Sequence, residues 1–131
     1  LQHDGPEPFH LVAWRAHSGS DSQAEAAVMV DVNGSEREAT GSGNGQIDAL
    51  YSAIDSVVQI ENELVEYRID AVTPGEDAQG AVVVRIKVDG IIYAGHGVAT
   101  DIVESSVRAY LTALNRAAVA VRSPLKAEAA V

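Results

Sequence analysis

The chain contains no cysteine, which excludes disulfide bonds, thiolate metal sites and cysteine-based catalysis. Basic residues are also scarce, since nine Lys and Arg stand against nineteen Asp and Glu, for a formal net charge of −10. This charge repels phosphate backbones and anionic lipid surfaces, so nucleic acid and membranes are poor partners. No apolar run approaches the ~18 residues of a membrane-spanning helix, and no signal-peptide pattern opens the sequence. We therefore expect a cytoplasmic protein.

The two ends of the chain carry little pattern. Residues 1–8 hold two prolines and no hydrophobic periodicity, which predicts a linker. Residues 122–131 contain a proline stop and predict a frayed C-terminal tail. Because the sequence begins with Leu1 rather than methionine, we expect it to be a piece of a longer protein.

The middle of the chain repeats one pattern. The stretch GSDSQAEAAVMVDVNG (19–34) matches GEDAQGAVVVRIKVDG (75–90) at an offset of 56 positions. Each copy runs from a turn into a β-branched strand and ends in Asn-Gly or Asp-Gly, a strong hairpin signal. Each then returns through a strand to closely spaced glycines, GSG (41–43) and GHG (95–97), which align at an offset of 54. The alternative is chance similarity between two ordinary hairpins.

Helices and further strands complete each copy. Alternating residues predict a strand ahead of each hairpin, at 9–17 and 63–72, and apolar residues at helical spacing predict helices at about 46–58 and 101–121. The predicted fold class is therefore α+β, with two β-β-β-α units related by internal pseudo-symmetry and packed together.

The predicted core is small. It has a single Phe and a single Trp, and alanine is frequent in the second helix, where it would let another helix approach closely. We therefore expect apolar surface left over for a second chain, in a symmetric homodimer.

Catalytic and metal-binding patterns are not found in the sequence. The four histidines (His3, His10, His17 and His96) show no metal-ligand spacing, and no Ser-His-Asp order or nucleophile elbow occurs. The acidic residues Asp70, Glu76 and Asp77 suit a solvated turn better than an acid/base pair. We expect no catalytic residue, no metal site and no cofactor in this chain.

The glycine-rich stretch GSGNG (41–45) precedes the first predicted helix. It lacks the lysine of a Walker A loop and the parallel β-α-β setting of a dinucleotide fingerprint. It is either a tight strand-to-helix turn or a ligand site. In a ligand site, the N–H groups of residues 43–45 would hold a carboxylate, with positive φ expected in the loop, and Asp48 would pair with a cation on the same ligand. A ligand with both charges is an amino acid.

The stretch GSGNGQIDAL, followed by VEYRIDAVTPGEDAQGAVVVRIKVDG and YAGHGVATDIVESSVRAYLTALNRAA, resembles the C-terminal regulatory domain of the 2-isopropylmalate synthases. Citramalate synthases share this domain. The resemblance makes residues 9–121 the regulatory domain, with repeats at about 9–58 and 61–121. It implies a homodimer that binds the end product of leucine biosynthesis as a feedback inhibitor. The acyltransferase activity and its divalent metal belong to a catalytic barrel outside these residues.

The resemblance also implies an effector pocket. The residues carried over are Gly43, Asn44, Gly45, Ile47, Asp48, Leu64, Tyr67, Ala71, Ala78 and Ile102. Gln46 departs from the family, which often has proline at this first helical position. The leading hypothesis is an allosteric module for leucine. The alternatives are an isoleucine-sensing domain of a citramalate synthase and a structural dimerisation domain without a ligand.

Overall fold

The computed structural model describes residues 7–72 and 79–122, so most of the predicted linker, most of the predicted tail and Ala78 lie outside the described residues. The elements are β1 (Phe9–Gly19), β2 (Ser22–Val32), β3 (Ser35–Gly43), α1 (Gln46–Val58), β4 (Glu63–Val72), β5 (Gly80–Val88), β6 (Ile91–Ala99) and α2 (Ile102–Arg122). This order confirms the predicted α+β class with two β-β-β-α units. We call β1–α1 the first unit and β4–α2 the second unit.

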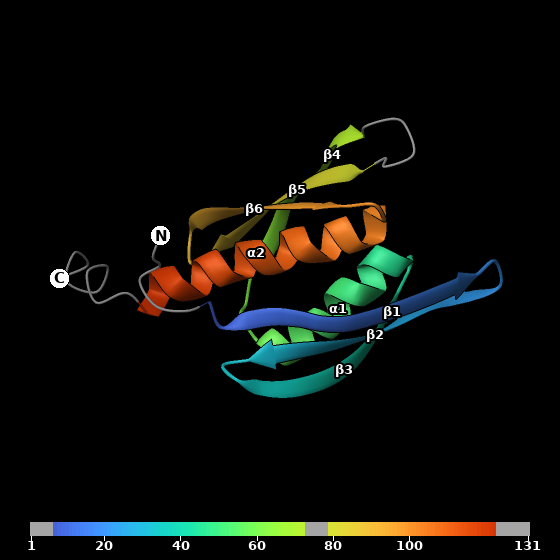
Figure 1. The fold of residues 1–131 in the computed structure, drawn as a ribbon, viewed down its shortest axis with the longest axis horizontal. Coiled ribbons are helices and arrows are strands. Elements are labelled where there is room, and N and C mark those ends of the chain that lie inside the picture. Colours follow the sequence, from blue (N-terminus) through green and yellow to red (C-terminus); the bar gives the residue numbers. More distant parts are fainter. Residues whose placement is uncertain (1–6, 73–78, 123–131) are drawn as a thin grey trace.

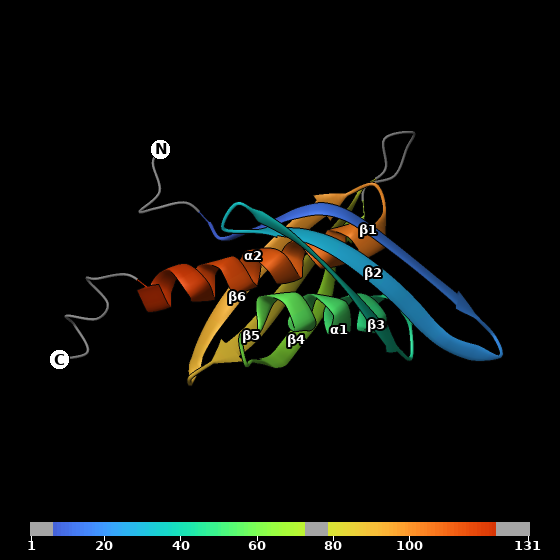
Figure 2. The same ribbon diagram turned by 90° about the horizontal axis from the view of Figure 1, so that it is seen from below.

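Each unit contributes one antiparallel three-stranded sheet. Sheet A has the order β1-β2-β3 and sheet B the order β4-β5-β6. The second hairpin of each unit turns through Asn33-Gly34 or Asp89-Gly90, and all four residues have positive φ, as the dipeptides predict. The helices lie between the sheets, α1 against β3 and β2 and α2 against β6 and β5 (Figures 1 and 2).

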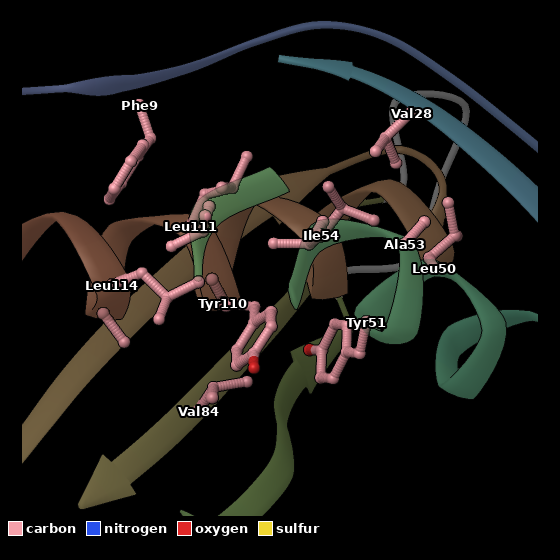
Figure 3. Packing of buried hydrophobic residues seen from close by; sticks show 14 of the residues in the cluster. Phe9, Val28, Leu50, Tyr51, Ala53, Ile54, Val84, Tyr110, Leu111 and Leu114 are labelled. Atoms are coloured by element: carbon pink, nitrogen blue, oxygen red, sulfur yellow. The ribbon is translucent and has the colours of Figure 1, made fainter. Parts of the chain in front are cut away.

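One hydrophobic core joins the two units. Alternate side chains of the central strands, such as Val28 and Val30 in β2 and Val82 and Val84 in β5, point toward the helices and are fully buried. Figure 3 shows Val28 and Val84 in one cluster with Leu50, Ile54 and Leu114 from the helices. The buried amide of Asn115 in α2 also bonds to both the N–H and the C=O of Phe9 in β1, at 2.8 Å each. The units therefore form one packed body.

The strand register corrects the alignment of the glycine pairs. Val28 pairs with Ala39 and Val84 with Gly95, so the offset of 56 holds through the third strands as well. Gly41 therefore corresponds to Gly97, whereas the sequence alignment matched Gly41 to Gly95. A glycine is needed at such places because a Cβ at Gly97 would lie 2.1 Å from the Ser105 carbonyl oxygen.

The alanines of α2 also have a role different from the expected one. A Cβ at Gly95 would lie 1.9 Å from the Ala109 carbonyl oxygen and 2.6 Å from the Ala113 nitrogen. Ala109, Ala113 and Ala117 are fully buried in the core of their own chain. They allow α2 to approach β6, so they give no support to an interface with a second helix.

The first strands of the two units also match, at an offset that sequence comparison missed. Val28 pairs with Trp14 and Val84 with Tyr67, and both first strands carry a bulge two residues earlier, at Val12 and Val65. This register aligns LVAWRA (11–16) with LVEYRI (64–69), which are 53 positions apart. The chain from Tyr67 to Val84 is therefore three residues longer than the chain from Trp14 to Val28, and this shift hid the match.

Candidate effector site

The start of α1 has no side-chain cap. Gly45 is the N-cap residue, with φ of −150° and no side-chain hydrogen bond to the first turn. The first helical bond runs from the Ala49 N–H to the Gly45 carbonyl at 2.9 Å, so the N–H groups of residues 46–48 have no acceptor within the helix. The predicted positive φ at Gly45 is wrong, because the residue is extended and a Cβ there would have nothing within 4 Å.

Asp48 folds back over the glycine-rich stretch. Its Oδ2 accepts the Asn44 N–H at 3.1 Å, and a Cβ on Gly43 would lie 2.5 Å from the same oxygen. Gly43 is the last residue of β3 and is buried. Its lack of a side chain therefore gives the Asp48 carboxylate its place beside the exposed Asn44 amide.

The inner face of β4 is apolar and exposed. Leu64, Tyr67 and Ile69 pair with the buried residues Ile86, Val84 and Val82 of β5, so they point to the helix side of sheet B. Their exposed fractions are nevertheless 45%, 36% and 52%. Exposed aliphatic and aromatic side chains on the face that points toward the core offer a surface for an apolar group.

Three hydroxyl groups connect this face to the helices. The Tyr67 hydroxyl lies 2.7 Å from the Ser106 Oγ, and the Tyr51 hydroxyl donates to the Ser106 carbonyl at 2.7 Å. Tyr51 lies one turn beyond Ile47 on α1, and Ser106 one turn beyond Ile102 on α2. The structure thus links Tyr67, through Ser106, to the second turn of each helix. A buried serine on the apolar face of α2 is the sequence signal that could have identified Ser106.

Three further residues of the expected pocket lie on α2, α1 and β4. Ile102 is partly buried, and its Cδ1 fills the space that a side chain on Gly80 would occupy. Ile47 is partly buried against the core, next to the exposed Asp48. Ala71 pairs with Ala81 in the β4–β5 ladder.

Behind the hydroxyl groups lies a second polar cluster. The rings of Tyr51 and Tyr110 stack with centroids 4.1 Å apart (Figure 3). The Tyr110 hydroxyl donates to Asp55 and accepts from the Asn62 amide at 3.2 Å. Burial raises the pKa of both phenols, and the Asp55 carboxylate adds to this effect at Tyr110. Both tyrosines therefore stay protonated donors at neutral pH.

No group of three or more His, Asp or Glu residues suited to a metal occurs among residues 7–72 and 79–122. In the same ranges, no helix has the length and hydropathy needed to cross a membrane.

Curated relatives cover nearly the whole chain. A 2-isopropylmalate synthase from Picosynechococcus is 41% identical over 95% of this chain, and one from Aquifex aeolicus is 42% identical over 86%. A third, from Pyrococcus furiosus, is 46% identical over 76%. The chain spans only 24%, 22% and 20% of the lengths of these three proteins.

A family model gives the same result. The model described as the LeuA allosteric (dimerisation) domain matches residues 1–118. These residues include the first unit, the second unit except the last turn of α2, and every position of the candidate site. The chain therefore belongs to the LeuA allosteric (dimerisation) domain family.

Proposed function

We propose that this chain is the effector-binding domain of a 2-isopropylmalate synthase and that it binds leucine as a feedback inhibitor. The observation that carries the proposal is that Tyr51, in the second turn of the uncapped helix α1, and Tyr67, on the exposed apolar face of β4, both bond to Ser106. One end of such a site suits charged groups and the other suits a hydrocarbon side chain. The relatives, all named 2-isopropylmalate synthase, favour leucine over isoleucine.

The charged end is formed by Gly43, Asn44, Gly45 and Asp48. The ligand carboxylate accepts from N–H groups at the start of α1, where the helix dipole favours an anion. Asp48 already accepts the Asn44 N–H and carries a negative charge, so the ligand ammonium is the group that belongs beside it.

We assign the apolar end to Ile47, Leu64, Tyr67, Ala71 and Ile102, together with Ala78, which lies outside the described residues. A pocket with aliphatic walls separates ligands that differ by one methylene by about 1–3 kcal/mol. Leucine should therefore bind at least ~10-fold more tightly than valine.

The domain also acts within a larger assembly. The family is named for dimerisation, and the exposed apolar residues on other strands, such as Val12, Ile92 and Val98, are surface that a second copy can cover. The relatives are four to five times longer than the matched region, so we assign the catalytic barrel to the rest of such a protein.

Calorimetry with leucine, isoleucine, valine and glutamate tests this function. Gly45→Val should abolish leucine binding because its side chain fills the open space next to the helix start. It should not unfold the chain, because nothing lies within 4 Å of the new Cβ. Asp48→Asn should weaken leucine about tenfold or more, as expected for a lost charge-assisted hydrogen bond. Asp31→Asn is the matched control, because Asp31 also accepts a backbone N–H, from Gly34, but in a distant hairpin. Equal binding of leucine, valine and glutamate would refute the assignment.

A further inference from the structure

Strand β4 and the segment before it are joined to α2 by side-chain hydrogen bonds. Tyr67 in the middle of β4 bonds to Ser106, and Asn62, just before the strand, bonds to Tyr110. Ser106 and Tyr110 are one helical turn apart on α2. The exposed inner side chains of β4 show that apolar packing onto the helices is weak here.

The first unit also bonds its edge strand to α2, but there the inner side chains of the strand are covered as well. Phe9 is buried there, and Leu11 and Trp14 pack against the core. The position equivalent to Ser106, 56 residues earlier, is Leu50, which is fully buried. At this helix position, the first unit thus makes apolar contact, whereas the second unit has the hydroxyl pair of Tyr67 and Ser106.

The hydrogen-bond directions fix the Tyr67 ring. The Ser106 hydroxyl donates its single proton to the Ile102 carbonyl at 2.8 Å, so Tyr67 must be the donor toward Ser106. Ser106 is fully buried, and its carbonyl also accepts from Tyr51. Its Oγ is therefore a fixed anchor for the phenol.

We propose that Ser106 is a positioning residue of the effector site, which holds Tyr67, and with it β4, at the distance from the helices that suits a leucine side chain. The inference rests on the proposed function, because it concerns the same pocket. Ser106 acts through Tyr67, so it governs which side chain fits.

Binding measurements test the selectivity. Ser106→Ala and Tyr67→Phe each remove the hydrogen bond, and Tyr67→Phe does so from an exposed residue that leaves the core intact. The leucine-to-valine affinity ratio should fall about three- to tenfold in each, the range expected for one hydrogen bond. The double variant should fall no further, because both changes remove the same contact. Ser56→Ala and Tyr93→Phe are the controls and should keep the wild-type ratio.

Amide hydrogen exchange separates this inference from the proposed function. In the ligand-free chain, β4 amides should exchange faster in Ser106→Ala and Tyr67→Phe than in wild type, while β2 and β5 amides should not change. If wild type binds no branched-chain amino acid, the proposed function fails, and the positioning of ligand by Ser106 fails with it even if the exchange result holds. Normal leucine binding with an unchanged affinity ratio and unchanged β4 exchange in Tyr67→Phe would overturn the inference about Ser106 alone.

Discussion

In the first unit, the inner face of the edge strand is covered. Trp14 packs against the core, and its indole N–H donates to Glu104 at the start of α2, at 3.2 Å. In the second unit, Tyr67 holds the equivalent place in β4, yet it and its neighbours Leu64 and Ile69 are exposed. The same repeated pattern thus covers the inner face of the edge strand in the first unit and leaves it exposed in the second.

The helix starts differ in the same sense. Asp101 caps α2, since its Oδ1 accepts the Val103 N–H at 2.8 Å and its carbonyl accepts the Ser105 N–H at 2.9 Å. Gly45, 56 positions earlier, offers no side-chain cap to α1. In a duplicated fold, a ligand site can thus arise where one copy leaves a strand face and a helix start open. The other copy covers the same strand face and caps the same helix start with its own side chains.

The largest expected effect concerns what the units share, the close approach of helix to third strand. Gly95→Ala places a Cβ 1.9 Å from the Ala109 carbonyl, so α2 must move away from β6. We expect about 3 kcal/mol or more to be lost from the free energy of unfolding, measured with urea. Gly41→Ala in the first unit meets backbone at 2.5 Å and should behave similarly. Gly19→Ala makes only ordinary contacts and is the control; a Gly95→Ala chain as stable as this control would contradict the packing argument.

The next effect comes from covering the exposed inner face of β4 as the first unit covers β1. Tyr67→Trp puts the indole of the first unit onto β4, where it should occupy the space proposed for the ligand side chain. We expect leucine to bind at least ~10-fold more weakly, about 1.4 kcal/mol. The reciprocal change Trp14→Tyr removes apolar contact and the bond to Glu104, so it should lower stability and leave leucine binding unchanged. Wild-type leucine affinity in Tyr67→Trp would show that the β4 face is not part of the pocket.

The sequence predicted the elements well because hydrophobic period and hairpin dipeptides are local signals. The bounds of α1 and β4 agree with the prediction, and α2 is displaced by a single residue. The same local signals could not align the first strands, because the three extra residues between Tyr67 and Val84 break the offset. Only the ladder register shows that Trp14 and Tyr67 are equivalent.

The site was less accessible to sequence reasoning. The residues of the glycine-rich stretch follow one another in the chain, so they could be named together. Ser106, Tyr51 and Tyr67 come from three elements and meet only through the packing of the units. The role of Gly43 in β3 also depends on how the chain folds, because the carboxylate that occupies the space beside it belongs to Asp48 in α1.

A smaller effect tests the helix starts. Asp101→Ala removes the cap of α2 and should cost about 1 kcal/mol in urea unfolding. Gly45→Asp gives α1 the cap of the second unit, which should change stability by only a few tenths of a kcal/mol. Its carboxylate would accept the N–H groups proposed for the ligand, so leucine should bind more weakly. Tight leucine binding by a stable Gly45→Asp chain would place the ligand carboxylate elsewhere.

The smallest expected effect concerns a charge that the first helix has and the second lacks. Asp55 in α1 corresponds to the buried Leu111 in α2, 56 positions later. Partial burial raises the pKa of Asp55, and the hydrogen bond from Tyr110 only partly opposes this effect. A raised pKa means that folding favours the neutral carboxyl. The stability that this group contributes is therefore present below its unfolded pKa of about 3.9 and is lost as pH rises through the higher folded value.

Asp55→Asn keeps an oxygen acceptor for Tyr110 without the charge. We expect it to raise the free energy of unfolding at pH 7 by less than about 1 kcal/mol, since Asp55 stays accessible to water. The gain should disappear near pH 3, where wild type is neutral as well, and a gain that instead grew on acidification would reverse the sign of this account.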